Sequence, residues 1–469
     1  MSMREINHLS QPLLRGRMYC YLKTNLGVIA LSKDEMERVR LPQKLCHAEG
    51  KAIGEIATLL YISGMSAARL VGYHMMTVNG QRLQAHLEAL ADIARTPDGI
   101  CRLSYSDSFW KSNAYVAQLM REAGMSVTTN PVGNVVGTYP GRSPRKITIG
   151  SHIDSVVNGG IFDGCLGVLA GIEAVHTLSE KGIVPEHSID VVSFAEEEGI
   201  VITGLIGSRA YCGLPPTEPV LEKMGEFGFT LQDLAEAKYT GDIDYSLELH
   251  IEQGGVLESQ KKDIGVVRSI IALRRYIVEF AGVANHAGTT PMTLRNDALV
   301  KAARFIMRVR QVVMETDPHM VGTVGHLEVQ PNAMNVVPGR VALTLELRGL
   351  REDLLESVYQ MLMEEFRKDI VSCRLTMEQP CFHMSETVQQ SVRNAAQKLG
   401  LAAMTMDSGA GHDSMSLSQV TRVGMIFVPS VKGISHSKEE FTTWDDVTNG
   451  ANVLLHALCD IDRLETPGR

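Results

Sequence analysis

The stretch KITIGSHIDSVVNGGIFDGCLGVLAGIEAVHTLSEKGIVPEHSIDVVSFA, residues 146–195, decides the fold class of this chain. An apolar, strand-like segment at 146–150 is followed by a glycine-rich loop, and a second such segment lies at 189–195. Between them, residues 164–180 repeat apolar side chains at intervals of three and four, which puts them in one stripe on a helix. Strand, helix and strand in this order predict a βαβ crossover within an α/β sheet.

The same alternation continues on both sides of this crossover, with one interruption. Helical patterns occupy 82–94, 110–123 and 386–399, and an apolar strand lies at 424–428. From 275 to 377 the predicted order is β-α-β-β-α-β, which is typical of a ferredoxin-like unit. The chain is therefore predicted to be α/β, with an α+β ferredoxin-like unit inserted into a larger domain. We expect an N-terminal extension at 1–76, the larger domain at 77–267 and 384–469, and the inserted unit at 268–383.

Composition excludes several classes of protein. The 469 residues carry a net charge of −9, which argues against a nucleic-acid-binding surface over the whole molecule. Eight cysteines occur without a C-x-x-C pair, so neither a cysteine zinc site nor a disulfide framework is indicated. No apolar run approaches the roughly 18 to 20 residues that span a bilayer, and the first thirty residues lack the pattern of a secretion signal. A cytoplasmic protein without a membrane partner is expected.

Polar residues follow several of the predicted strands. His152, Asp154 and Asp163 lie in the glycine-rich loop, and three glutamates, an LHIEQ segment and an ISHS segment follow later apolar stretches. Residues just beyond parallel strands converge at one edge of the sheet. Asp163 can equally cap the following helix and Asp154 can close a turn, so the joint pattern carries the functional interpretation. Histidines with carboxylates and no cysteine suit zinc or manganese, and also cobalt or nickel.

Seven segments together resemble one family. They are SHIDSVVNGGIFDGCLGVLAG (151–171), AEEEG (195–199), ELHIEQG (248–254), NHAGTTPM (285–292), NVVPG (335–339), SGAGHDSM (408–415) and GISHS (433–437). In this order, and from about residue 78 to the C-terminus, they are similar to the M20-type metal-dependent amidohydrolases. Within that family they resemble the branch of allantoate amidohydrolases and N-carbamoyl-L-amino-acid hydrolases.

The resemblance implies a site with two divalent metal ions per subunit. His152, Asp163 and His250 would bind one ion, and Asp163, Glu198 and His436 the other, with Asp163 bridging. Asp154 would orient His152. Glu197 would be the general base, while Glu196 has no implied role. Because successive residues of a strand point in opposite directions, we expect strand geometry to separate Glu197 from its neighbour Glu198.

The inserted unit is expected to complete this site as a lid. By resemblance, His286 would donate to the developing oxyanion, Arg348 would hold the substrate carboxylate, and Asn335 and Gln253 would contact substrate. Hinge closure would then bring the two parts together. The resemblance also implies a homodimer through the inserted unit, with His286 acting either in its own subunit or in the neighbouring one.

Two features depart from the family pattern. After its glutamates this chain reads GIVIT at 199–203, where the family commonly has a Ser-Arg-Phe-like stretch. This loop is expected to border the metal site, so the departure bears on the substrate and on full activity. Residues 1–76 carry ten Lys and Arg against six Asp and Glu, a net charge of +4, and leave −13 for the rest. Their segment 48–76 faintly resembles a LuxR-type helix-turn-helix, but the basic residues that would read a DNA groove are missing. A degenerate remnant or a mistaken start site, a packing element, and a DNA-binding head are the three explanations, and nucleic acid is the least expected partner.

The resemblance implies hydrolysis of the ureido C–N bond of a small carboxylate-bearing substrate, with release of ammonia and carbon dioxide. The AEEEG and SGAGHDSM segments favour allantoate. The alternatives are an N-carbamoyl-L-amino acid or ureidoglycolate, an M20 peptidase or aminoacylase, and a ligand-sensing DNA-binding protein whose hydrolase domain is inactive.

Overall fold

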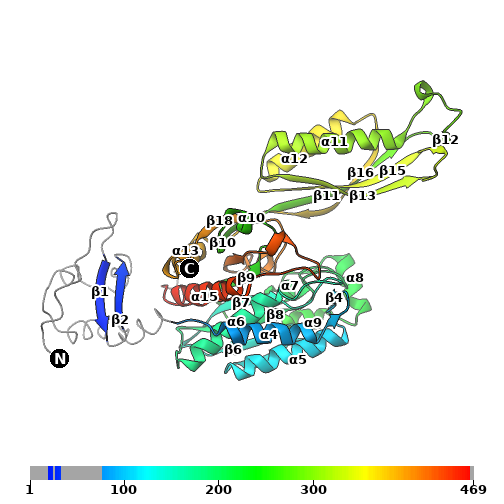
Figure 1. Ribbon diagram of the computed structural model, residues 1–469. Coiled ribbons are helices and arrows are strands. Elements are labelled where there is room, and N and C mark those ends of the chain that lie inside the picture. Colours follow the sequence, from blue (N-terminus) through cyan, green and yellow to red (C-terminus); the bar gives the residue numbers. More distant parts are fainter. Residues whose placement is uncertain (1–18, 25–26, 33–75, 465–469) are drawn as a thin grey trace. The chain divides into compact units, whose positions relative to one another are not determined.

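The computed structural model describes residues 19–24, 27–32 and 76–464, and the chain divides into two compact units at residues 77 and 78 (Figure 1). In the first unit, β1 (Tyr19–Thr24) and β2 (Gly27–Ser32) form an antiparallel hairpin. The segment that resembles a helix-turn-helix lies, up to residue 75, outside the described residues. Across the part of the chain that the structure describes, no helix is long and apolar enough to cross a membrane.

The larger sheet of the second unit has nine strands. Its order is β17-β10-β19-β9-β7-β8-β6-β5, with β18 also pairing with β10. The neighbours β19, β9, β7 and β8 are parallel, and the strands that flank them include antiparallel pairs. The strands are β5 (Ser126–Thr129), β6 (Val135–Tyr139), β7 (Ser143–His152), β8 (His187–Phe194), β9 (Ile243–Ile251), β10 (Ile264–Ile270), β17 (Phe382–His383), β18 (Ala403–Ser408) and β19 (Arg422–Val428).

The predicted crossover helix is α6 (Cys165–Glu180), which joins the parallel strands β7 and β8. The sequence predicted one buried stripe, but 13 of its 16 residues are buried, because α4 and α15 cover it on the side away from the sheet. Small residues let it approach the strands closely. A Cβ at Gly167 would lie 2.3 Å from the carbonyl oxygen of Leu249 on β9.

The remaining helices of this part of the chain are long on the covering layers and short in the loops. They are α4 (Gly80–Asp92), α5 (Asp107–Glu122), α7 (Ile206–Cys212), α8 (Glu218–Glu226), α9 (Leu231–Ala237), α10 (Val256–Gln260), α13 (Glu386–Lys398), α14 (Ser414–Leu417), α15 (Trp444–Ile461) and the 3-10 turn η3 (Val431–Gly433). A small hairpin, β3 (Arg95–Thr96) and β4 (Gly99–Ile100), follows α4.

A separate four-stranded sheet lies between β10 and β17 in the chain. Its strands β11 (Ala272–Ala281), β13 (Val321–Gln330), β15 (Arg340–Gly349) and β16 (Ile370–Gln379) are antiparallel in the order β13-β15-β11-β16. The helices α11 (Ala298–Thr316) and α12 (Glu352–Glu365) pack against it around Phe280, Phe305 and Phe366. This is the β-α-β-β-α-β order of a ferredoxin-like unit. The predicted fold class, α/β with an inserted α+β unit, is confirmed.

Candidate functional site

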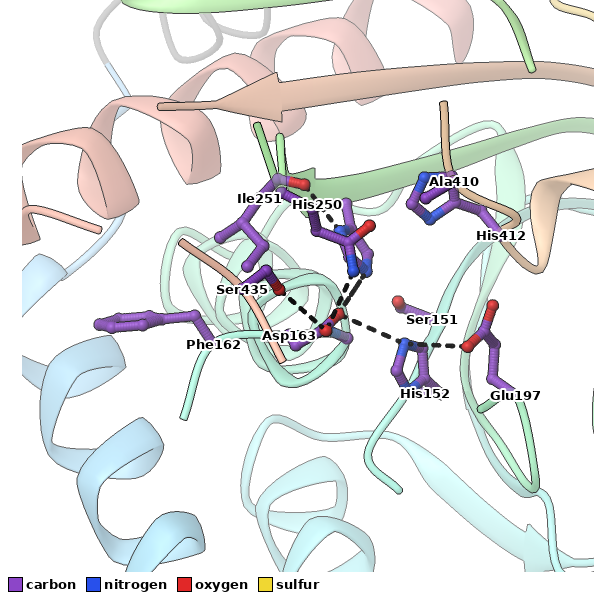
Figure 2. A network of polar contacts seen from close by, with 12 residues as sticks. Ser151, His152, Phe162, Asp163, Glu197, His250, Ile251, Ala410, His412 and Ser435 are labelled. Carbon is purple, nitrogen blue, oxygen red and sulfur yellow. Dashed lines mark hydrogen bonds and ion pairs between the residues drawn. The ribbon is translucent and has the colours of Figure 1, made fainter. Parts of the chain in front are cut away.

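The predicted metal ligands meet at one edge of the larger sheet. His152 is the last residue of β7, His250 is the next-to-last residue of β9, and Glu198 follows the end of β8. His436 comes from the loop after β19, which runs parallel to β9. Because these strands run in the same direction, their carboxyl ends bring together side chains from distant parts of the chain. Figure 2 shows the imidazoles of His152 and His250 on two sides of the Asp163 carboxylate.

Three buried residues form the first candidate metal site. The Nε2 atoms of His152 and His250 lie 3.8 and 3.2 Å from Oδ1 of Asp163. Each imidazole is oriented by its other nitrogen, since Nδ1 of His152 lies 3.1 Å from the carbonyl oxygen of Asp154 and Nδ1 of His250 lies 2.8 Å from that of Ile251. An Nδ1–H bond to a carbonyl leaves the Nε2 lone pair pointing into the cluster, as a metal ligand requires.

The second candidate site shares Asp163 with the first. Nε2 of His436 lies 3.2 Å from Oδ2 of Asp163 and 3.6 Å from Oε2 of Glu198. Gln253 also belongs to this cluster, because its amide Nε2 donates to Oδ2 of Asp163 at 3.0 Å. His436 is half exposed, with 49% of its side chain accessible, so this second site is the one open to solvent.

The residues present fit a pair of divalent cations. Two ligand atoms bound to one tetrahedral ion at 2.0–2.1 Å are about 3.3 Å apart, and the distances between the imidazole nitrogens and the carboxylate oxygens lie close to this value, from 3.2 to 3.8 Å. Among the described residues, the buried Oδ1 of Asp163 and Oε1 of Glu198 have no hydrogen-bond partner. A buried carboxylate oxygen without a donor is costly. A cation at these positions would remove that cost.

The charges in the cluster also indicate a site for cations. Burial works against a charged His152, but the nearby carboxylates, chiefly Glu197, outweigh it and raise its pKa well above the usual value. The hydrogen bond to Asp163 raises the pKa of His436 to about 9. Burial raises the pKa of Glu198 to about 7. This group of carboxylates requires positive charge, which either a proton on an imidazole or a metal ion can supply.

The three consecutive glutamates have three different surroundings. Strand β8 ends at Phe194, and Glu196 has a positive φ of 56°, so these residues form a turn and not a strand. The expectation that strand alternation separates Glu197 from Glu198 is therefore wrong, because the turn separates them. Oε2 of Glu197 lies 3.6 Å from Nε2 of His152, while Glu198 approaches His436.

Glu196, which has no implied chemical role, braces the loop that departs from the family pattern. Its side chain is fully buried and accepts hydrogen bonds from the backbone N–H groups of Val201 and Ile202, at 2.8 and 2.5 Å. The GIVIT segment is thus tied to the same turn that carries Glu197 and Glu198. Its conformation is coupled to the position of these two carboxylates.

Asp154 holds this turn against the end of β7. Its two carboxylate oxygens accept the backbone N–H groups of Glu197 and Glu198 at 3.2 and 3.1 Å. Its Oδ1 atom lies 3.6 Å from Nδ1 of His152, which is longer than a hydrogen bond. In this structure the carbonyl oxygen of Asp154 orients the imidazole, and its carboxylate positions the turn.

The SGAGHDSM segment lies against the ligand His250. The ring of His412 packs edge to face on His250 with centroids 4.5 Å apart, and burial lowers the pKa of His412 well below its usual value. Burial also raises the pKa of the neighbouring Asp413 to about 8. Glu248, two residues before His250, accepts hydrogen bonds from the backbone N–H and the hydroxyl of Ser414 at 2.9 and 2.6 Å. The segment thus forms a buried polar layer beneath the cluster.

His286 and Asn335 lie together on the inserted unit. The short strands β12 (Asn285–His286) and β14 (Val336–Val337) pair with His286 opposite Val336, next to Asn335, and both predicted residues are exposed. Nδ1 of His286 accepts the backbone N–H groups of Gly288 and Thr289 at 3.1 and 3.2 Å. The neutral ring therefore carries its proton on Nε2, which leaves that atom as a donor.

Arg348 comes from β15 and reaches the loop that carries His412. Its Nε donates to Glu346 at 2.7 Å, and its Nη1 donates to the carbonyl oxygen of Gly409. The guanidinium is thus positioned beside the SGAGHDSM segment, while 28% of its side chain stays accessible. An accessible, oriented fork of this kind can bind a carboxylate through paired hydrogen bonds.

Sequence reasoning missed one residue of the cluster, Glu440. In the sequence it belongs to SKEEF, which resembles an ordinary charged loop, yet Glu440 is buried. Its carboxylate accepts the backbone N–H groups of Phe162 and Asp163. Only its spacing of four residues after His436 could have drawn attention to it.

Comparison with known proteins gives consistent results. A family model described as Peptidase family M20/M25/M40 matches residues 148–460. The chain is 39% identical to an N-carbamoyl-L-amino acid amidohydrolase of Geobacillus stearothermophilus, over 81% of this chain and 98% of the relative. It is 33% identical to an allantoate amidohydrolase of Escherichia coli K12, over 81% of this chain and 97% of the relative. The crystal structure of an amidase of the hydantoinase/carbamoylase family from Burkholderia multivorans superposes with a TM-score of 0.75 at 34% identity, over 82% of this chain and 98% of the other.

These similarities confirm the resemblance that the seven segments indicated. Members of the family bind metal ions and hydrolyse C–N bonds, and this chain is a hydrolase of that kind with buried candidate metal sites. Allantoate, the first substrate expected from the sequence, is less well supported than its alternative, because the carbamoylase relative shares the higher identity. The chain belongs to the M20/M25/M40 family and, within it, to the hydantoinase/carbamoylase branch of amidohydrolases.

Proposed function

We propose that this protein hydrolyses the carbamoyl C–N bond of N-carbamoyl-L-amino acids and releases ammonia, carbon dioxide and the free amino acid. The observation that carries the proposal is the pair of ligand trios that share Asp163, with Glu197 beside them but in neither trio. The identity with the carbamoylase relative supports this substrate class over allantoate.

His152, Asp163 and His250 would hold one divalent ion, and Asp163, Glu198 and His436 a second. Imidazole and carboxylate donors suit zinc or manganese, and also cobalt or nickel. When bound, such ions supply Lewis acidity and lower the pKa of water toward neutrality. Asp154 would keep Glu198 in place for this purpose through its hydrogen bond to the turn.

Glu197 would act as the general base and then as the general acid. Its Oε2 atom lies 3.6 Å from Nε2 of His152, at the margin of the first trio, and its side chain is 11% exposed. From this position Oε2 can take a proton from the attacking water and return it to the leaving nitrogen.

The inserted unit would bind the two ends of the substrate. Nε2–H of His286 would donate to the oxygen of the carbamoyl group as it gains negative charge, with Asn335 beside it as a further contact. Arg348 would hold the carboxylate of the amino acid. Gln253 already donates to Asp163, so we assign its amide primarily to holding that carboxylate and only its Oε1 atom to substrate.

We also infer that the protein is a homodimer through the inserted unit. Along α11, Val300, Met307 and Met314 are 55%, 71% and 67% exposed and recur every seven residues, so they form one apolar stripe on the outer face of the helix. A second copy of the chain would cover this stripe. Met307→Glu is expected to shift the mass measured by light scattering from two chains to one, and an unchanged mass would contradict the inference.

The function is tested by ammonia release over a substrate panel. Metal-free protein would be reconstituted with zinc, manganese, cobalt or nickel and given N-carbamoyl-L-amino acids, allantoate, ureidoglycolate, N-acetyl amino acids and dipeptides. We expect the highest kcat/KM with N-carbamoyl-L-amino acids, loss of activity with a chelator, and recovery on adding metal. Preference for allantoate or ureidoglycolate would show that this compound, and not an N-carbamoyl-L-amino acid, is the substrate. Hydrolysis of dipeptides or N-acetyl amino acids alone would refute the proposed reaction.

A further inference from the structure

We propose that Glu440 is a positioning residue that holds the turn of Asp163 and the loop of His436 at the spacing that two metal ions require. The inference rests on the ligand roles given under the proposed function. It adds a residue 277 positions from Asp163 in the chain, in a segment whose composition gives no sign of a buried function.

The contacts of Glu440 join the two ligand segments directly. Its Oε1 atom accepts the backbone N–H of Phe162 at 3.0 Å and that of Asp163 at 3.1 Å. Its Oε2 atom accepts the hydroxyl of Ser435 at 2.9 Å. Ser435 immediately precedes His436, so one carboxylate connects the backbone of the shared ligand to the neighbour of the exposed ligand.

Ser435 strengthens this connection through a second carboxylate. Its Oγ atom also lies 3.3 Å from Oδ2 of Asp163, the oxygen that faces His436 (Figure 2 shows the contact between Ser435 and Asp163). The single hydroxyl proton can go to only one acceptor at a time. The shorter distance favours Glu440, so Gln253 rather than Ser435 is the hydrogen-bond donor to Oδ2 of Asp163, and this oxygen keeps a lone pair for a metal ion.

The surroundings of Glu440 are built to hold its carboxylate in place. The residue is 5% exposed, and a Cβ at Gly160 would lie 2.3 Å from Oε1, so only glycine leaves room for it. Among the described residues, no lysine or arginine forms an ion pair with it. Two carboxylates close together without a cation repel each other, and metal ions bound to Asp163 would offset that repulsion.

The alternative is that Glu440 merely braces the loop. A brace would contribute to the stability of the folded protein and leave the metal affinity of the folded state unchanged. A positioning residue would change the affinity itself, and more at the His436 site than at the His250 site, because His436 is tied to the cluster through Ser435. Hydrogen-bonded groups behind metal ligands typically change metal affinity 10- to 100-fold when they are removed.

The experiment compares Glu440→Ala, Glu440→Gln and Ser435→Ala with wild type by titrating metal-free protein with zinc or manganese in a calorimeter. Glu440→Ala should weaken one of the two equivalents about 10- to 100-fold. Glu440→Gln keeps a carbonyl oxygen for the two N–H groups and should stay within about threefold. Ser435→Ala removes one hydrogen bond and should weaken the same equivalent about three- to tenfold. The matched control is Glu439→Ala, because Glu439 contacts Ser437 at the surface and should bind as wild type does.

Thermal unfolding of each metal-free variant separates the two explanations. A lower Tm for Glu440→Ala with wild-type affinity for both equivalents would show a brace and overturn the inference. If Glu440→Ala does not fold, unchanged affinity in Ser435→Ala overturns it. Failure of wild type to bind two equivalents would refute the proposed function, whereas normal binding by wild type together with normal binding by the variants would refute only the role of Glu440.

Discussion

Replacement of Glu197 by glutamine tests the assignment of the general base. The change keeps the shape of the side chain and exchanges Oε2, which lies 3.6 Å from Nε2 of His152, for an amide that cannot accept a proton. Glu197 belongs to neither ligand trio, so its loss should leave metal binding intact. General-base catalysis contributes about 10²- to 10⁴-fold, which corresponds to about 2.7–5.4 kcal/mol in the barrier at 1.36 kcal/mol per tenfold. We therefore expect kcat to fall by that factor with metal content unchanged.

The adjacent glutamates supply matched controls for this assay. Glu198→Gln should lower metal content, because Glu198 is one of the ligands gathered around His436. Glu196→Gln keeps an oxygen for the N–H groups of Val201 and Ile202 and should cost only a few fold in kcat. The assays are ammonia release at saturating substrate and elemental analysis of the dialysed protein. Loss of metal in Glu197→Gln, with metal retained in Glu198→Gln, would mean that the two roles are reversed and would refute the assignment.

Three further predictions concern substrate binding, pH and the inserted unit. Arg348→Ala should raise KM and lower kcat/KM with little change in Tm, since the side chain is 28% exposed. If this variant has wild-type kinetics, the substrate carboxylate binds elsewhere. Burial opposes the charge on His187, but hydrogen bonds to Asp462 and Asp244 raise its pKa. Its stabilising contribution is therefore complete below the unfolded pKa of about 6.5 and is lost as pH rises through the folded pKa. The Tm of wild type should therefore fall more than that of His187→Gln between pH 6 and 8.5. Parallel curves of Tm against pH for the two proteins would contradict this. Phe305→Ala removes a fully buried ring between Phe280 and Phe366 and should destabilise the inserted unit by about 3–5 kcal/mol in urea unfolding followed by hydrogen exchange; a loss below about 1 kcal/mol would show that the site repacks.

Local sequence patterns predicted the positions of most helices and strands correctly, but they did not predict how these elements are buried. The helix at 164–180 was predicted to within one residue at its start, because its apolar spacing and the glycine before it are local signals. Its burial on almost every side was not predicted, since that depends on α15, which lies about 280 residues further along the chain. A stripe calculated from one segment contains no information about what covers the other faces.

The candidate site divides in the same way. The positions after strands pointed to a group of histidines and carboxylates, the family resemblance selected His152, Asp163, Glu198, His250 and His436 from it, and the structure gathers the other four around Asp163. The roles of supporting residues were not accessible from sequence. Asp154 positions the glutamate turn with its carboxylate, and Glu196 braces the departing loop; both contacts are made to a backbone turn that begins with a positive φ at Glu196.

The sequence by itself determined the fold class with its inserted unit and, through its resemblance to a known family, the groups that gather at the sheet edge. Hydrophobic periodicity and the direction of parallel strands are properties of short segments, so they can be read without knowing the rest of the molecule. Only the tertiary structure decided which carboxylates support which ligands, and it alone brought Glu440 to the backbone of Asp163. Hydrogen bonds between segments hundreds of residues apart depend on the tertiary packing of the whole chain, and a local sequence pattern contains no information about that packing.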